Sequence, residues 1–179
     1  MPKYLCFLRG INVSGHKIIK MAELRELLNS AGYKNVKTYI QSGNIILDSA
    51  ITTIEEQSLA IELLLQEKYG WDIPCVVLDT EGLNRIVKNN PFKNISKEKA
   101  TLPYVCIPKR DLSKNDLEVL KEVHFEGEYF NVTKNAIYLY STLEINKSKM
   151  SNNFFEKKLS ISCTTRNWRT LNKLKELSI

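Results

Sequence analysis

Two short polar stretches carry the side chains and glycines best suited to bind a ligand. The first, RGINVSG, contains Arg9, Gly10 and Asn12 and follows an apolar run. The second, Gln41–Asn44, has the sequence QSGN and joins two other apolar runs. A guanidinium offers forked donors that fit a carboxylate or phosphate, and glycine lets the backbone approach a ligand closely. These stretches therefore predict a binding module for an anionic small molecule or a nucleotide.

A third polar stretch, TTRNW, covers residues 164–168, follows the last expected strand and opens the last expected helix. Thr165 or Asn167 can cap that helix, because a short polar side chain accepts from the first helical N–H groups. Arg166 is the residue that capping does not explain. The predicted ligand-binding residues are Lys20, which precedes the first expected helix, and ten residues of the three stretches: Arg9, Gly10, Asn12, Gln41, Ser42, Gly43, Asn44, Arg166, Asn167 and Trp168.

The same residues also have a structural interpretation. Glycines serve turns, Asn44 can pair with the backbone, and Arg9 can donate to carbonyl groups. Lys17 and Lys20 precede the first expected helix, whose N-terminus can itself hold an anion. Because loops carry function more often than strands do, the binding interpretation stays open beside the structural one.

Catalysis is the next alternative. The motifs GxxxxGKS, GxGxxG, GxSxG and HExxH are all absent. Scattered carboxylates such as Asp48, Asp72 and Asp79 fit solvated or capping positions better than a paired general acid and base. The sequence thus identifies no catalytic residue and no cofactor, and it leaves open an enzyme of another class.

The four cysteines lie in apolar runs and show no C-x-x-C spacing, and only two histidines accompany them. A zinc site is therefore disfavoured, and each thiol is expected to behave as a small buried hydrophobe. The strand order predicted below places two pairs on neighbouring strands. We expect four free thiols, with Cys6 beside Cys75 and Cys106 beside Cys163.

The net charge of +6 is concentrated in residues 146–179, which contain eight Lys or Arg against two Glu. Such a segment can attract nucleic acid, but a solvated helix face is the preferred explanation. RNA-recognition domains of the expected fold stack bases on aromatic residues of their first and third strands. The third strand here, Ile45–Asp48, has no aromatic residue. Nucleic-acid binding in that mode is therefore disfavoured.

Hydrophobic spacing defines the elements that position these stretches. Prolines, glycines and polar runs separate the elements. We expect strands at 3–8, 36–40, 45–48, 75–78, 104–107, 129–132, 136–140 and 161–164, and helices marked by apolar residues within 21–28, 54–65, 81–88, 117–123, 150–159 and 168–177.

This order reads β-α-β-β-α-β twice, which predicts an α+β fold with two tandem ferredoxin-like subdomains, a linker helix and a C-terminal helix. The predicted division is 1–80, a helix and linker at 81–101, and 102–179. No residue-by-residue repeat is visible, so the duplication concerns element order. Right-handed crossovers give strand order 4-1-3-2 and bring the exit of strand 1 beside the hairpin between strands 2 and 3.

No run approaches the 18 apolar residues that a transmembrane helix needs, and the N-terminus lacks the features of a signal peptide. We therefore expect a cytoplasmic protein without membrane contact. Its oligomeric state cannot be read from the sequence.

Five motifs in order, FLRGINVSG, MAELRELL, TYIQSGNIILDS, NNPF and TTRNW, resemble the family called domain of unknown function 1697. The similarity runs from Leu5 to about Leu174. The family usually has Gly-Gly where this chain has Ser14 and Gly15. The resemblance implies two α+β subdomains of ferredoxin-like type. It supplies no activity, cofactor or catalytic residue.

Overall fold

The computed structural model describes residues 1–92, 103–143 and 148–179. The chain forms two compact units. One comprises Met1–Asn84 with Lys173–Ile179, and the other comprises Arg85–Asn172. The elements are β1 (Lys3–Leu8), α1 (Met21–Ser30), β2 (Lys34–Tyr39), β3 (Asn44–Asp48), α2 (Ile54–Tyr69), β4 (Cys75–Asp79), α3 (Thr80–Lys88), β5 (Tyr104–Pro108), α4 (Lys114–Lys121), β6 (Glu128–Thr133), β7 (Ala136–Ser141), α5 (Asn152–Leu159), β8 (Cys163–Asn167) and α6 (Trp168–Leu177).

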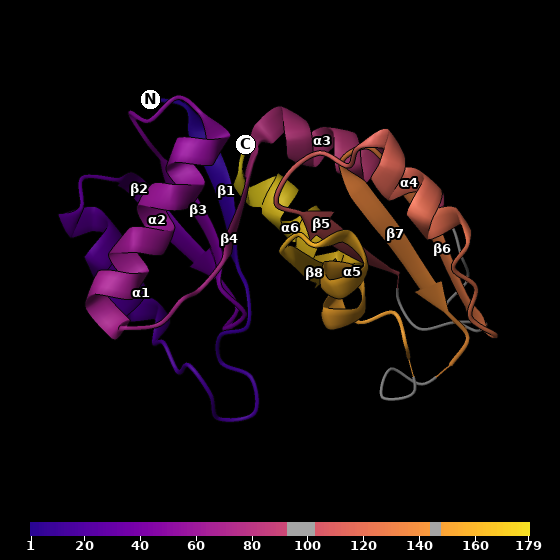
Figure 1. Cartoon of the computed structure of the whole chain (residues 1–179). Helices are drawn as coiled ribbons and strands as arrows, with labels where there is room; N and C mark the ends of the chain where they lie inside the picture. Colours follow the sequence, from indigo (N-terminus) through magenta and orange to yellow (C-terminus); the bar gives the residue numbers. More distant parts are fainter. Residues whose placement is uncertain (93–102, 144–147) are drawn as a thin grey trace. The chain divides into compact units, whose positions relative to one another are not determined.

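The first unit contains an antiparallel sheet in the order β2-β3-β1-β4, with α1 and α2 on one face (Figure 1). Side chains alternate between faces along a strand, and every third or fourth residue of a helix returns to one side. Cys6 of β1, Leu24 of α1 and Ile61 of α2 are fully buried together for this reason. The strand order 4-1-3-2 predicted for this half is confirmed.

The second unit repeats the arrangement with the order β6-β7-β5-β8. Its core joins Cys106 of β5 to Leu120 of α4 and Phe155 of α5. The chain therefore has the predicted α+β fold with two similar subdomains. The added helices α3 and α6 were also expected, and a boundary between the compact units falls inside each of them.

The repeat extends to particular residues, which the sequence pattern did not reveal. Cys75 opens β4, and its N–H donates to Glu62 Oε1 at 2.7 Å. Cys163 opens β8, and its N–H donates to Glu156 Oε1 at 3.0 Å. The same contact from helix to strand therefore holds the fourth strand of each sheet. The two halves match at these positions although their helices differ in length.

All four cysteines are free and buried, as predicted. Burial and the adjacent Cys75 thiol raise the pKa of Cys6 well above its ordinary value. A hydrogen bond with Cys163, together with burial, does the same to the pKa of Cys106. The expected pairs therefore lie side by side, and the raised pKa keeps Cys6 and Cys106 as thiols, which are poor nucleophiles.

Helices α2 and α5 occupy equivalent places but have 16 and 8 residues, respectively. Thr53 caps α2 by accepting from Glu56 N–H, and Gly70 ends it in the left-handed conformation at φ 70°. Ser151 caps α5, and Ser160 ends it at φ 53°. The shorter α5 leaves part of the second sheet without a helix above it.

Several predicted boundaries were wrong, among them the start of α5 and both ends of β8. Helix α5 begins at Asn152, so Met150 precedes it. Strand β8 runs from Cys163 to Asn167, whereas the sequence placed the end of that strand at 164. The polar residues continue the strand because β5 pairs with β8 along its whole length, as far as Tyr104 opposite Asn167. Pairing with a neighbouring strand overrides a loop-like composition.

No described helix is long and apolar enough to cross a membrane. The predicted subdomain limits, 1–80 and 102–179, stay a prediction. The helix predicted at the start of the segment 81–101 is α3, which begins at Thr80, and the linker predicted after it falls largely outside the described residues.

Candidate functional site

The first two polar stretches meet at one edge of the first sheet, as the topology predicted. Leu8 N–H donates to the Gly43 carbonyl at 2.9 Å, which joins the end of β1 to the hairpin between β2 and β3. Arg9 N–H donates to the Pro74 carbonyl at 2.9 Å, which adds the segment before β4. We call the surface made by residues 9–20 and 40–43 the loop edge.

Asn12 holds the loop edge together. Its Nδ2 donates to the Ile19 carbonyl at 3.0 Å and to the Gln41 carbonyl at 2.7 Å. Its Oδ1 accepts from Ile19 N–H at 2.8 Å. One carboxamide thus closes the loop between β1 and α1 and ties it to the neighbouring hairpin. Asn12 thus lies at the predicted edge of the sheet, and the hydrogen bonds of its carboxamide fix the shape of the loop.

Strained backbone is concentrated at the loop edge. Of the described non-glycine residues with positive φ, four lie here: Asn12, Ser14, Lys17 and Ile40, at 54°, 49°, 47° and 51°. Ile40 is the most unusual of them, because a β-branched side chain crowds the backbone in this conformation. Each such residue costs about 1–3 kcal/mol, which the surrounding structure must offset, and residues of this kind cluster at ligand sites.

The hairpin residues have distinct roles. Asn44 opens β3 and is fully buried, and its Nδ2 donates to the Tyr39 carbonyl at 3.0 Å and to Ser42 Oγ at 2.9 Å. Gly43 has φ 73° and lies so close to β1 that an added Cβ would stand 2.7 Å from Leu8 Cβ. Gln41 is exposed. Asn44 and Gly43 therefore shape the hairpin, and Gln41 offers a side chain to solvent.

Cationic side chains surround the same loops. Arg9 is half-buried directly after β1, and Gly10 follows it with φ 72° and nothing within 4 Å of an added Cβ. Lys17 Nζ donates to the Asp72 carbonyl at 2.5 Å. Lys20 lies 3.3 Å from Glu23 in an exposed pair, which water screens strongly. Lys20 also precedes α1, whose N-terminus has no side-chain cap.

The third predicted stretch lies in the other compact unit and mostly within a strand. Arg166 is only 8% exposed, and its Nη1 donates to Thr164 Oγ1 at 2.6 Å and to the Thr165 carbonyl at 3.0 Å. Asn167 Oδ1 accepts from Thr170 N–H at 2.7 Å, so Asn167 is the helix cap. Trp168 is the half-buried first residue of α6. Their role in ligand binding stays a prediction.

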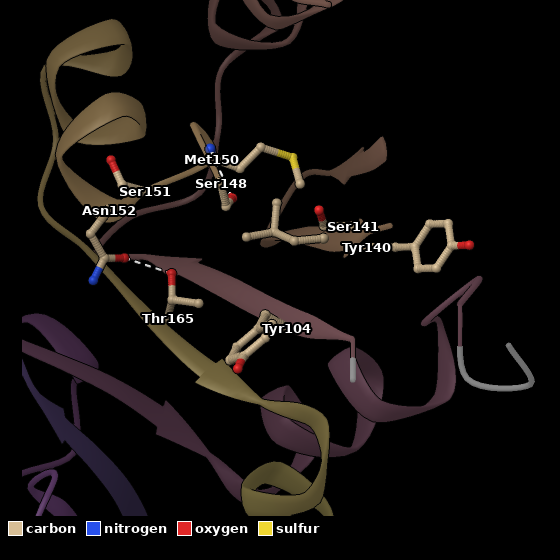
Figure 2. Close-up of a pocket in the computed structure, with 9 residues that line it drawn as sticks. Tyr104, Tyr140, Ser141, Ser148, Met150, Ser151, Asn152 and Thr165 are labelled. Atoms are coloured by element: carbon tan, nitrogen blue, oxygen red, sulfur yellow. Dashed lines mark hydrogen bonds between the residues drawn. The ribbon is translucent and has the colours of Figure 1, made fainter. Parts of the chain in front are cut away.

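A pocket of about 250 Å³ in the second unit was not predicted (Figure 2). Its walls come from β5, β7, β8 and the start of α5, so no single stretch of sequence marks it. The only signal in the sequence is the run of serines around Met150. Within the described ranges, no group of three or more His, Cys, Asp or Glu residues could hold a metal ion.

The family model described as "Protein of unknown function (DUF1697)" matches residues 1–138. The chain belongs to this family. The DUF1697 match includes the first two polar stretches and ends before TTRNW.

One solved structure similar to this DUF1697 chain is the conserved bacterial protein SP0830 from Streptococcus pneumoniae. The identity is 21%, the comparison covers 99% of both chains, and the TM-score is 0.81. At this identity the likeness establishes the fold alone. No curated protein matches the chain.

Proposed function

We propose that this protein binds an anionic small molecule or a nucleotide at the loop edge. The observation that carries the proposal is the cluster of strained, non-glycine residues in two loops that Asn12 ties together. Evolution readily removes strain of about 1–3 kcal/mol per residue when nothing depends on it. A preorganised binding loop is a reason to keep it.

The side chains at the loop edge favour an anion. Arg9, Lys17 and Lys20 bring three positive charges to residues 9–20, where Lys20 pairs with Glu23 and Lys17 donates to the backbone carbonyl of Asp72. Gly10 and Gly15 have positive φ and nothing within 4 Å of an added Cβ, so a ligand can approach the backbone at both positions. In this proposal Arg9 forms a forked contact with the anion, and Lys20 exchanges its exposed partner for it.

Thermal stabilisation by inorganic pyrophosphate and AMP tests the proposal. A ligand at 100 times its dissociation constant stabilises the folded state by about 2.7 kcal/mol. For a chain of this size that shifts the melting temperature by roughly 5–10 °C. Arg9→Met keeps much of the aliphatic stem and removes the fork, so it should abolish this shift and leave the unliganded melting temperature nearly unchanged.

Arg169→Met is the matched control, because Arg169 is an exposed arginine on α6 in the other compact unit. It removes the same charge and should keep the full ligand shift. A large drop in the unliganded melting temperature of Arg9→Met, together with no stabilisation of the native protein across a broad anion screen, would make Arg9 a structural residue. The assignment of the loop edge would then be dropped.

A further inference from the structure

The pocket in the second unit lies on the helical face of its sheet, beside the start of α5 (Figure 2). Leu139 and Ser141 of β7 reach it from alternate positions, as two residues on the same face of a strand must. Tyr104 and Thr165 line it from β5 and β8. All of its lining residues belong to this one compact unit.

The pocket exists because α5 lacks a turn that α2 has. Glu62 and Glu156 make the same hydrogen bond in the two halves, which aligns α2 with α5. On that alignment, Asn152 at the start of α5 corresponds to Ser58, and the first turn of α2, from Ile54, has no helical counterpart. No helix covers the equivalent area of the second sheet, and residues of the segment before α5, among them Met150, line the pocket there instead.

The two corresponding tyrosines show the consequence. Cys6 and Cys106 match, so Tyr4 of β1 corresponds to Tyr104 of β5. Tyr4 is only 3% exposed in the first core, whereas Tyr104 is half-buried and lines the pocket. The missing helical turn therefore converts a packed core position into the wall of a cavity.

A buried carboxylate holds the opposite wall in place. Glu128 is 5% exposed, and its two oxygens accept from the Ser148 hydroxyl and from Lys149 N–H, the latter at 3.0 Å. These bonds anchor the segment that carries Met150 over the pocket (Figure 2). The wall is thus built by a specific polar contact, and it does not depend on apolar packing alone.

The lining is uncharged and mixed in polarity. It combines apolar surface from Tyr104, Leu139 and Met150 with hydroxyl groups, and Thr165 Oγ1 donates to Asn152 Oδ1 at 2.6 Å. Burial raises the pKa of Tyr104, so its phenol stays neutral at physiological pH. A charged ligand would lose its hydration there without gaining an opposite charge from the lining, which is costly.

From this geometry we propose that the pocket binds an uncharged, single-ring aromatic or heteroaromatic compound that carries an amide or hydroxyl group. The ring packs against Tyr104, Leu139 and Met150. Its amide or hydroxyl group donates to the hydroxyl oxygen of Ser141 or Ser148, and these oxygens also accept from Leu143 N–H at 3.0 Å and from Met150 N–H at 3.2 Å, respectively. A volume of about 250 Å³ accommodates one ring and its substituent. This site is separate in chemistry and position from the anion site proposed at the loop edge.

Benzamide and benzoate form a matched pair of probes, because they share a shape and differ in charge. In a ¹H–¹⁵N NMR titration of the full chain, benzamide should shift the amide signals of Tyr104, Asn152 and Thr165 saturably, with a dissociation constant of about millimolar, as expected for so small a ligand. Benzoate should leave these signals unshifted. Equal binding of both probes, or no saturable shift with benzamide, would overturn the proposal without the need for any variant.

Thr165→Phe places a ring in the pocket from the half-buried face of β8 and should abolish the benzamide shifts. Thr133→Phe is the control, because Thr133 is a half-buried strand threonine of the same unit outside the pocket lining. It should retain benzamide binding. Benzamide shifts that persist in a folded Thr165→Phe protein would assign them to another surface and refute the pocket as the site.

Discussion

Substituting Gly43 by alanine tests the close contact on which the loop edge depends. Gly43 has φ 73°, and its carbonyl accepts from Leu8 N–H at 2.9 Å. An added Cβ would stand 2.7 Å from Leu8 Cβ and 2.8 Å from Ile11 Cδ1. Ile11 can turn its terminal methyl away, but Leu8 Cβ is attached directly to the buried backbone of β1. The strand or the hairpin must therefore move.

The expected cost has two parts. A left-handed conformation destabilises a non-glycine residue by about 1–2 kcal/mol. Replacing glycine by alanine also lowers the conformational entropy of the unfolded chain, which offsets about 0.4–1 kcal/mol of this loss. Overpacking a tight contact adds about 1–3 kcal/mol. Gly15→Ala isolates the first part, because Gly15 has φ 78° and nothing lies within 4 Å of its added Cβ.

Urea unfolding followed by circular dichroism measures the difference between the two variants. Gly15→Ala should lose about 1 kcal/mol and Gly43→Ala about 2–4 kcal/mol. Because each kcal/mol corresponds to roughly 2–4 °C for a chain of this length, Gly43→Ala should also melt several degrees below Gly15→Ala. If the two variants were equally stable, the hairpin would not press on β1 as described, and the argument for a tightly formed loop edge would fail.

Acid unfolding and thiol reactivity provide two more tests. Hydrogen bonds from Arg110 and Ser113 lower the pKa of Asp116 from 3.8 to about 2, so its stabilisation is complete above pH about 4 and is lost as the pH falls towards 2. Asp116→Asn should lower the free energy of unfolding at neutral pH and reduce the loss of stability between about pH 4 and pH 2. If circular dichroism shows the same acid unfolding for the variant and the native protein, Asp116 does not make this contribution. Thiol titration without reductant should find four reactive thiols after denaturation and only slow reaction in the native state, since burial protects all four; fewer than four in the denatured chain would indicate a disulfide.

Local patterns in the sequence were sufficient for the element order, both strand orders and the neighbouring cysteines. Helical spacing such as that of Leu24 and Leu28 and the apolar run around Cys6 depend only on residues close in the chain. Once the elements are known, the handedness of crossovers leaves few topologies. The meeting of the Arg9 and Gly43 loops follows from that topology and could be predicted from the sequence.

The tertiary structure decided which polar groups face inward. Asn44 and Arg166 are predicted ligand-binding residues, and only the tertiary structure shows that both are buried and donate to nearby backbone or hydroxyl oxygens. Strand β8 extends to Asn167 because β5 needs a hydrogen-bonded partner along its full length. The pocket beside Tyr104 arises because α5 starts a turn later than α2 does. Whether a polar residue is used inside the fold or offered to a ligand depends on neighbours far away in the chain, and periodicity contains no information about them.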